Sequence, residues 1–234
     1  MKRWLQWFRR SPARSLTASM AARLAQLPAP RDSTAALTER FVVLDVEATG
    51  LNTRKDLILA IGAVALQDGG IVLADRFHCV LKREHEVTDS VLIHGLGPDA
   101  VAQGVSVEEG LLSFLEFIQD SPLLAFHAPY DEQLLTRELR NAFDYRWQHR
   151  CIDVAELAPL LTGAPLKEST LDDWLTYFNI PLLERHHAWG DAYATAKMVL
   201  QLFRLAQQQG IHTSADLYQK LAQFKQQTSP SFSF

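Results

Sequence analysis

The order of strand-like and helix-like segments constrains the fold of this chain more than any other feature. Three apolar stretches rich in β-branched residues come first, and segments with helical apolar spacing then alternate with two short strands. The expected strands are 41–47, 57–66, 69–81, 122–128 and 150–152, and the expected helices are 107–120, 131–143, 153–161, 170–178 and 188–209. This order predicts an α/β fold with a mixed five-stranded sheet flanked by helices. The turn Asp68-Gly69-Gly70 predicts that the second and third strands form a hairpin.

The composition is that of a soluble globular protein. Hydrophobic residues make up 47% and charged residues 21%, which excludes a disordered chain. No apolar run approaches the ~20 residues of a membrane span, and no apolar stretch follows the basic N-terminus, so a secretory signal is not expected. Cys79 and Cys151 lie far apart and fit reduced thiols better than a disulfide framework. We therefore expect a cytoplasmic protein.

The charge divides the chain into two parts. Residues 1–40 hold eight Lys or Arg and two Asp or Glu, a net charge of +6, whereas the rest hold fifteen and twenty-five, a net charge of −10. A protein that coats nucleic acid would carry a basic domain, so an acidic body favours an enzyme that handles chain ends. We expect a basic extension and linker at 1–38, the main domain at 39–210, and a C-terminal helix and polar tail at 211–234.

Two carboxylates lie on the first expected strand. Asp45 and Glu47 are two residues apart, so both project from one face, and their apolar neighbours indicate a buried strand. Burying two like charges is costly unless a cation is bound. The alternative is a strand end that reaches solvent before the Thr49-Gly50 turn. These two residues alone leave both interpretations open.

Two more acids lie at the starts of expected helices. Asp131 opens a helix whose apolar face it shares, and Asp191 lies at the edge of a face of small residues. Each acid alone is explained more simply as a helix cap or as a partner of the helix dipole. The pair His186-His187 just before Asp191 adds two candidate imidazoles, and a histidine beside several inward acids is less readily explained as structural.

The donor set predicts a metal-dependent site. Hard carboxylate oxygens suit Mg²⁺ or Mn²⁺. Four carboxylates and one histidine, with no cysteine cluster, match a site in which two ions ~4 Å apart stabilise the attacking and leaving oxygens of a phosphodiester. A histidine with a pKa near neutrality can deprotonate the attacking water.

Three short motifs carry a resemblance to a known family. They are D-V-E-A-T-G at 45–50, F-H-A-P-Y-D at 126–131 and H-H-A-W-G-D-A at 186–192. In order and spacing they resemble the exonuclease motifs of the DEDDh family, which includes the proofreading epsilon subunit of bacterial DNA polymerase III. The likeness covers about residues 40–207. It implies a ribonuclease H-like fold and a 3′→5′ exonuclease.

The resemblance also implies roles for the core residues. Asp45, Glu47 and Asp191 would hold the first of two Mg²⁺ or Mn²⁺ ions, and Asp45 would reach the second. Asp131 would support the second ion through water. His186 would be the general base, because the family pattern places four residues between the base and the last Asp.

Substrate contacts are implied at five further positions. By the same resemblance these are Thr49, Leu51, His94, Tyr130 and His127. Thr49 and Leu51 would touch the terminal nucleotide, and His94 belongs to an I-H-G-L element that would line the cleft. His127 is a departure, since many relatives have Asn there, and its side chain would hydrogen-bond near the site.

The two ends of the chain suggest partners. Residues 1–10 mix basic side chains with aromatic ones, which is compatible with a short packed helix or with a segment that docks on a partner or a membrane surface. Gln227 to Phe232 faintly resembles the peptide that binds the polymerase sliding clamp, although Pro230 stands where an aliphatic residue is expected. A disordered tail is the simpler interpretation.

The sequence therefore predicts a metal-dependent 3′→5′ exonuclease that releases nucleoside monophosphates from single-stranded 3′ ends, with DNA favoured. An RNA-directed exoribonuclease or oligoribonuclease of the same chemistry is an alternative. A non-catalytic scaffold that docks on a membrane or a partner is another, and a missing core acid or histidine would have supported it.

Overall fold

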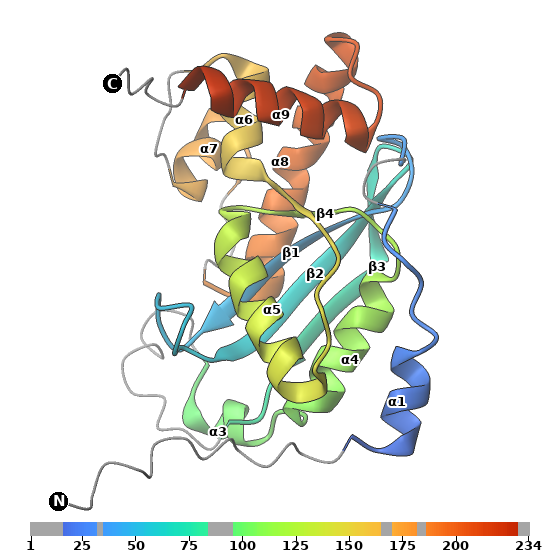
Figure 1. Ribbon diagram of the computed structural model, residues 1–234. Helices are drawn as coiled ribbons and strands as arrows, with labels where there is room; N and C mark the ends of the chain where they lie inside the picture. Colours follow the sequence, from blue (N-terminus) through green and yellow to red (C-terminus); the bar gives the residue numbers. More distant parts are fainter. Residues whose placement is uncertain (1–15, 32–34, 84–95, 165–169, 182–185, 229–234) are drawn as a thin grey trace, which may run out of the picture.

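The computed structural model describes residues 16–31, 35–83, 96–164, 170–181 and 186–228 (Figure 1). His94, the N-terminal segment 1–10 and most of the C-terminal motif at 227–232 lie outside the described residues. The predictions made for them keep that status.

A single five-stranded sheet forms the centre of the described chain. Its strands are β1 (Phe41–Ala48), β2 (Ile58–Gln67), β3 (Gly70–Val80), β4 (Leu123–Ala125) and β5 (Cys151–Asp153). Their spatial order is β3-β2-β1-β4-β5, which puts β1 in the middle. The first three strands pair antiparallel, and β4 and β5 join in parallel. The predicted mixed sheet is confirmed.

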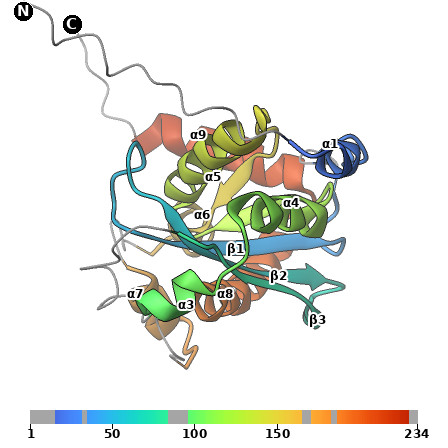
Figure 2. The ribbon, with the colours of Figure 1, turned by 90° about the horizontal axis from the view of Figure 1, so that it is seen from below.

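Helices cover both faces of this sheet (Figure 2). They are α1 (Ala18–Leu24), α3 (Pro98–Ala102), α4 (Val107–Ile118), α5 (Ala128–Phe143), α6 (Val154–Thr162), α7 (Leu171–Tyr177), α8 (Ala188–Gln208) and α9 (Ser214–Thr228). Helices α4 and α5 pack on one face and α8 packs on the other, while α6, α7 and α9 add side chains to the hydrophobic cluster under α8. No helix among the described residues is long and apolar enough to cross a membrane.

The alternation of side chains along β1 decides which helices its residues meet. Val42, Leu44 and Val46 belong to the core under α4 and α5, whereas Phe41 and Val43 belong to the core under α8. The same period of two assigns positions 45 and 47 to the face that α8 covers. Strand β1 thus presents its two acids to a single helix.

The residues at two turns explain the β2–β3 hairpin and the position at which helix α5 begins. Asp68 and Gly69 both have positive φ, at 52° and 74°, the conformation that a two-residue hairpin turn requires, so the predicted hairpin is confirmed. The start predicted for the helix at 131–143 is wrong by three residues, since α5 begins at Ala128. Pro129 is tolerated there because first-turn N–H groups have no helical partner.

The chain beyond the sheet is tied to the core. On α9, Leu217 and Leu221 are buried in the same hydrophobic cluster as residues of α8. At the other end, the Arg23 guanidinium of α1 donates to the carboxylates of Glu109 and Glu116 on α4, at 2.7–2.9 Å. The division into segments 1–38, 39–210 and 211–234 stays a prediction.

Candidate active site

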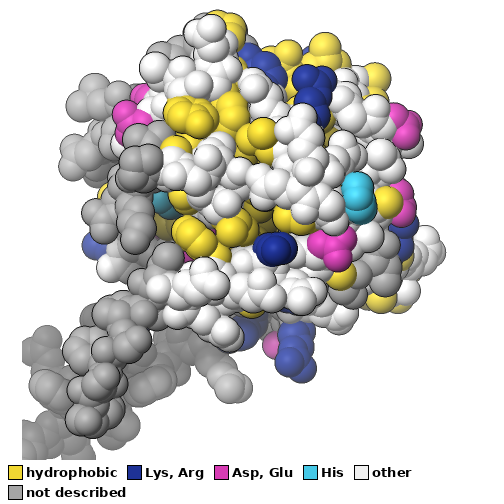
Figure 3. Space-filling model, turned by 90° about the horizontal axis from the view of Figure 1, so that it is seen from above, with side chains coloured by type: hydrophobic (Ala, Val, Ile, Leu, Met, Phe, Trp, Pro, Cys, Tyr) yellow, Lys and Arg dark blue, Asp and Glu magenta, His cyan; other side chains and the backbone are white. Residues whose placement is uncertain are grey.

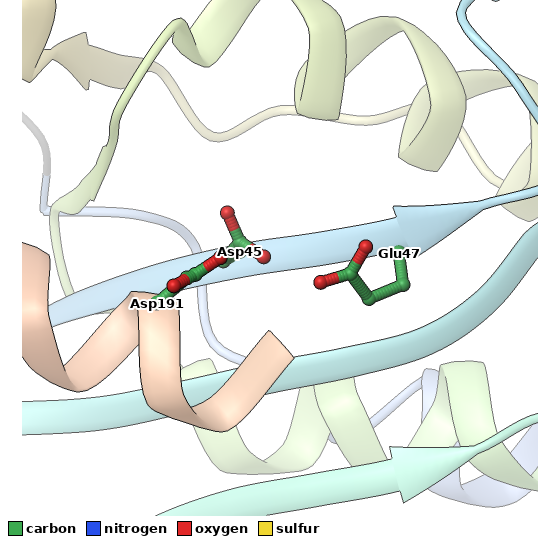
Figure 4. A group of neighbouring side chains, drawn as sticks. All are labelled: Asp45, Glu47 and Asp191. Carbon is green, nitrogen blue, oxygen red and sulfur yellow. The ribbon is translucent and has the colours of Figure 1, made fainter. Parts of the chain in front are cut away.

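Three carboxylates meet where strand β1 faces the first turn of helix α8. Asp45 and Glu47 come from β1, and Asp191 comes from α8. One ligand oxygen of each lies within 4.8 Å of those of the other two, and Figure 4 shows the three side chains beside one another. Like charges this close repel unless a cation lies among them. Hard oxygen donors in this arrangement fit Mg²⁺ or Mn²⁺.

The close approach of α8 to the sheet depends on Gly62 of strand β2. Gly62 pairs with Asp45 across the β1–β2 ladder. A Cβ atom at Gly62 would lie 2.2 Å from the carbonyl carbon of Ala188, where α8 begins. A residue without a side chain therefore lets the helix backbone approach the strand, which brings Asp191 to the β1 acids.

Asp131 reaches the same strand from helix α5. Its side chain is buried, and its Oδ1 accepts a hydrogen bond from the Val46 N–H at 3.0 Å. Strand β1 pairs with β4 at Val42 and Val43. The Val46 N–H lies beyond that paired stretch, and the Asp131 carboxylate accepts its hydrogen bond instead. Burial raises the pKa of Asp131 well above its ordinary value, although the bond from Val46 lowers it; the charges of Asp153 and Glu47 raise it further.

The two adjacent histidines have different surroundings. His186 is exposed and lines the cleft, and its backbone N–H donates to Asp191 Oδ2 at 3.0 Å. His187 is the N-cap residue of α8, and its ring stacks on that of His78 from β3, with centroids 4.8 Å apart. Among the described residues that line the cleft, His186 is present and His187 is not.

All five predicted core residues line one cleft of about 490 Å³, together with Leu51, Tyr130 and His127 of the predicted substrate contacts. Leu51 is 90% exposed at its rim and has the free apolar surface that a nucleobase needs for contact. The Tyr130 hydroxyl donates to the Gly50 carbonyl at 2.7 Å. Burial, and then the charge of Asp131, raises the pKa of Tyr130 to about 12, so the hydroxyl keeps its proton at neutral pH.

Thr49 has a different setting from the one expected, whereas His127 lines the cleft. Thr49 is not among the described residues lining the cleft. Its hydroxyl donates to Asp56 and accepts from the Leu57 N–H, which closes the loop after β1. His127 precedes α5 with a positive φ of 60°, and its backbone N–H donates to Asp153 Oδ1 at 3.0 Å.

Some residues of the site were not among the predictions. Phe126, Thr170 and Leu171 also line the cleft, the last two from the start of α7. Sequence carries little signal for such residues, because tertiary packing brings α7 over the site. Gly62 did carry a signal, since an isolated glycine inside an apolar strand indicates a close backbone approach.

Comparison with known proteins adds to this geometry. The profile of the RNase_T family, described as exonuclease, matches residues 42–199. A PolC-type DNA polymerase III of Thermotoga maritima is 33% identical over 172 residues, which cover 73% of this chain and 12% of that protein. The PolC-type enzyme of Bacillus subtilis is 27% identical over 187 residues, 79% of this chain and 13% of that protein. The chain thus spans about an eighth of the length of these relatives.

Solved structures show the same fold at low identity. Exonuclease I of E. coli in complex with a dT13 oligonucleotide has a TM-score of 0.61 at 15% identity, over 73% of this chain and 42% of that one. The nuclease domain of 3′hExo, a DEDDh family member bound to rAMP, has a TM-score of 0.63 at 14% identity, over 72% of this chain and 93% of that one.

Fold and site together define a ribonuclease H-like α/β protein with a carboxylate-lined cleft. The chain belongs to the RNase_T exonuclease family, whose profile covers residues 42–199. The family expected from the three sequence motifs is confirmed.

Proposed function

We propose that this chain hydrolyses the 3′-terminal phosphodiester bond of single-stranded nucleic acid, with DNA favoured, and that the reaction depends on two Mg²⁺ or Mn²⁺ ions. The convergence of Asp45, Glu47 and Asp191 carries this proposal, because three carboxylates this close repel one another and offer hard oxygen ligands to a cation. When bound, such ions neutralise charge on the phosphate and make attack by water at neutral pH feasible.

We assign His186 as the general base. It stands at the cleft next to the carboxylate cluster, and its backbone is held by Asp191. The imidazole would take one proton from a water molecule whose oxygen attacks the terminal phosphorus. The bond from phosphorus to the 3′-oxygen of the preceding nucleotide then breaks, and a nucleoside 5′-monophosphate leaves.

Asp131, Leu51 and Tyr130 would prepare the site for this reaction. Asp131 is placed to support the second ion through water, as the family resemblance implies, while its Oδ1 holds Val46. Leu51 offers apolar surface to the terminal base. The Tyr130 hydroxyl, bonded to Gly50, would hold the loop that carries Leu51 against α5.

The choice of DNA rests on the relatives. Those with at least 27% identity cited above are DNA polymerases by name, and E. coli Exonuclease I was solved with a DNA oligonucleotide. An RNA substrate is the second candidate, because the 3′hExo nuclease domain was solved with rAMP. Discrimination between DNA and RNA would depend on contacts to the 2′-hydroxyl group of the ribose.

The other partner proposals have weaker support. Docking of residues 1–10 on a partner or membrane, and binding of 227–232 to a sliding clamp, rest on sequence alone. The cytoplasmic location likewise stays a prediction. A non-catalytic scaffold is disfavoured, because all five core residues are present and line one cleft.

The proposal is tested with 5′-labelled single-stranded DNA and RNA of matched sequence, incubated with the full chain and Mg²⁺ or Mn²⁺. We expect one-nucleotide shortening from the 3′ end, faster on DNA, and its loss in Asp45→Ala and in excess chelator. Absence of metal-dependent shortening of either strand by the wild type would refute the proposed activity.

A further inference from the structure

A second groove lies on the outer side of helix α5. It has a volume of about 660 Å³ and runs between the loop after β1, at Thr53 and Arg54, and Trp147 in the segment that follows α5. In Figure 1 this is the side of α5 turned toward the viewer, with the loop on one flank and the segment before β5 on the other. None of the predicted site residues that the structure describes lines this groove.

The groove is basic in a body that is acidic overall. Arg54, Arg137 and Arg140 line it, against a single acid, Glu132. Arg54 and Arg140 are exposed, and within the described part of the chain neither forms an ion pair. On the face shown in Figure 3, by contrast, basic and acidic side chains are interspersed. The groove is therefore a local exception to the net charge of −10 after residue 40.

The wall of the groove is held in place by hydrogen bonds. The Arg137 guanidinium donates to the backbone carbonyls of Thr53 and Asp56, and the Thr53 hydroxyl donates to Gln133 Oε1 at 2.8 Å. Arg137 also pairs with Glu138, at 3.1 Å. Because both terminal guanidinium nitrogens, Nη1 and Nη2, are engaged, Arg137 fixes the loop, while Arg54 and Arg140 are left to face a ligand.

The groove lies close to the active-site cleft. Leu51 lines the cleft and Arg54 lines the groove, and three residues of chain span at most ~11 Å. On α5, Tyr130 faces the cleft and its neighbour Pro129 faces the groove. A stacked strand advances ~3.4 Å per nucleotide, so the two sites are separated by at most about three nucleotides.

We propose that this groove is a second subsite that binds the phosphate backbone of the substrate strand, upstream of the 3′ end held in the cleft. Arg54 and Arg140 bind phosphates, and the partly buried Trp147 lines the groove on its other flank. The inference rests on the proposed exonuclease function and deepens it. It explains how an acidic protein holds a polyanion, because basic side chains that are unpaired in the described part of the chain gather along the path of the strand.

Substrate length distinguishes this subsite from the catalytic cleft. A strand of two nucleotides stays within the cleft and does not reach Arg54 and Arg140, whereas a strand of about twelve does, at ~3.4 Å per nucleotide. The subsite therefore lowers KM for long strands and leaves the turnover of short ones unchanged.

The test compares Arg54→Glu/Arg140→Glu with wild type on a thymidine dinucleotide and a twelve-nucleotide thymidine strand. The control is Arg204→Glu, a charge reversal at an exposed position on α8. We expect the double variant to raise KM for the long strand about tenfold or more at low salt, with kcat and the short substrate unaffected. The slope of log KM against log salt should fall by about 1.4, because each phosphate that an arginine neutralises on a single strand contributes ~0.7.

Two results would overturn the subsite. One is a long-strand KM that matches those of wild type and Arg204→Glu; the other is an equal loss on both substrates, which indicates a disturbed cleft. Fluorescence anisotropy of the labelled long strand, recorded in chelator, measures binding without cleavage. It therefore distinguishes a failure of the proposed subsite from a failure of the catalytic proposal. If wild type binds but does not cleave and the double variant binds more weakly, the groove stands and the exonuclease function falls.

Discussion

At the scale of single residues, the chemistry depends on which of two adjacent histidines faces the substrate. His186 lines the cleft, whereas the His187 ring stacks on His78 of the edge strand β3. The motif spacing favours His186, and the structure places only this one of the pair at the cleft. The role of His186 as the general base is a prediction, which substitution of each histidine in turn would test.

We predict that His186→Ala lowers kcat by about 10²–10⁴-fold, the usual contribution of a general base. His187→Ala should lower it far less, because its ring contacts His78 rather than the cleft. Hydrolysis of a labelled strand at saturating substrate and metal measures kcat for both variants. The reverse order of effects would contradict the assignment of the base.

Asp131 gives a second residue-scale prediction, which concerns stability. Burial raises the pKa of this carboxyl in the folded state, so above the ordinary pKa the unfolded chain releases a proton that the folded chain still holds. Folding stability without metal therefore falls as the pH rises through this window.

Asp131→Asn removes this titration and keeps an oxygen that can accept from Val46. We expect the metal-free variant to be at least as stable as wild type at neutral pH, with an advantage that shrinks toward low pH. It should still lose nearly all activity. Thermal unfolding in chelator across pH checks this, and a variant that loses stability equally at every pH would refute the account.

At the scale of elements, the site is assembled by the seating of α8 on the sheet. Sequence periodicity predicted the strand with its two acids and the helix with its one, because alternation and helical spacing are local properties. It could not predict that their oxygens come within 4.8 Å, which depends on how closely the two backbones pack. Gly62 is the residue that sets this distance.

We predict that Gly62→Ala separates α8 from β1. A methyl group 2.2 Å from the Ala188 backbone must push the helix away, at a typical overpacking cost of ~1–3 kcal/mol. Metal affinity and activity should fall together. Gly70→Ala in the same hairpin is the matched control, because its nearest neighbouring atom is 3.8 Å away. Equal effects of the two variants on metal binding would contradict this role for Gly62.

The predicted start of α5 shows the limit of a single local motif. The sequence pattern puts Asp131 at the opening of its helix, whereas Ala128 and Pro129 precede it in the first turn. A proline can mark a loop or a first helical turn, and only the fold decides between them. Asp131 therefore lies within the helix and bonds to β1, a contact 85 residues away in sequence that no local pattern records.

At the scale of the whole molecule, the acid stability of the fold depends in part on His149. This side chain is 5% exposed, and its Nδ1 has no hydrogen-bond partner among the described residues. Burial lowers the pKa of His149 to about 4, against the opposing effects of a hydrogen bond to the Ser121 backbone and the charge of Asp120. The folded protein thus holds this ring neutral at a pH where the unfolded chain protonates it.

We predict that wild type loses stability as the pH falls from about 6.5 to about 4, since only the unfolded chain takes up this proton there. The loss from His149 alone is on the order of 3 kcal/mol. His149→Gln should show a smaller loss over the same window in urea unfolding. Parallel curves for the two proteins would exclude His149 as a source of the acid sensitivity.

The central claim is that carboxylates from β1 and α8 form a divalent-metal site. Calorimetric titration of the metal-free full chain with Mn²⁺ tests it directly, with Asp45→Asn as the comparison. We predict saturable binding of at least one ion to wild type and a loss of that binding in the variant. An absence of binding to wild type, or equal binding to both proteins, would contradict the account.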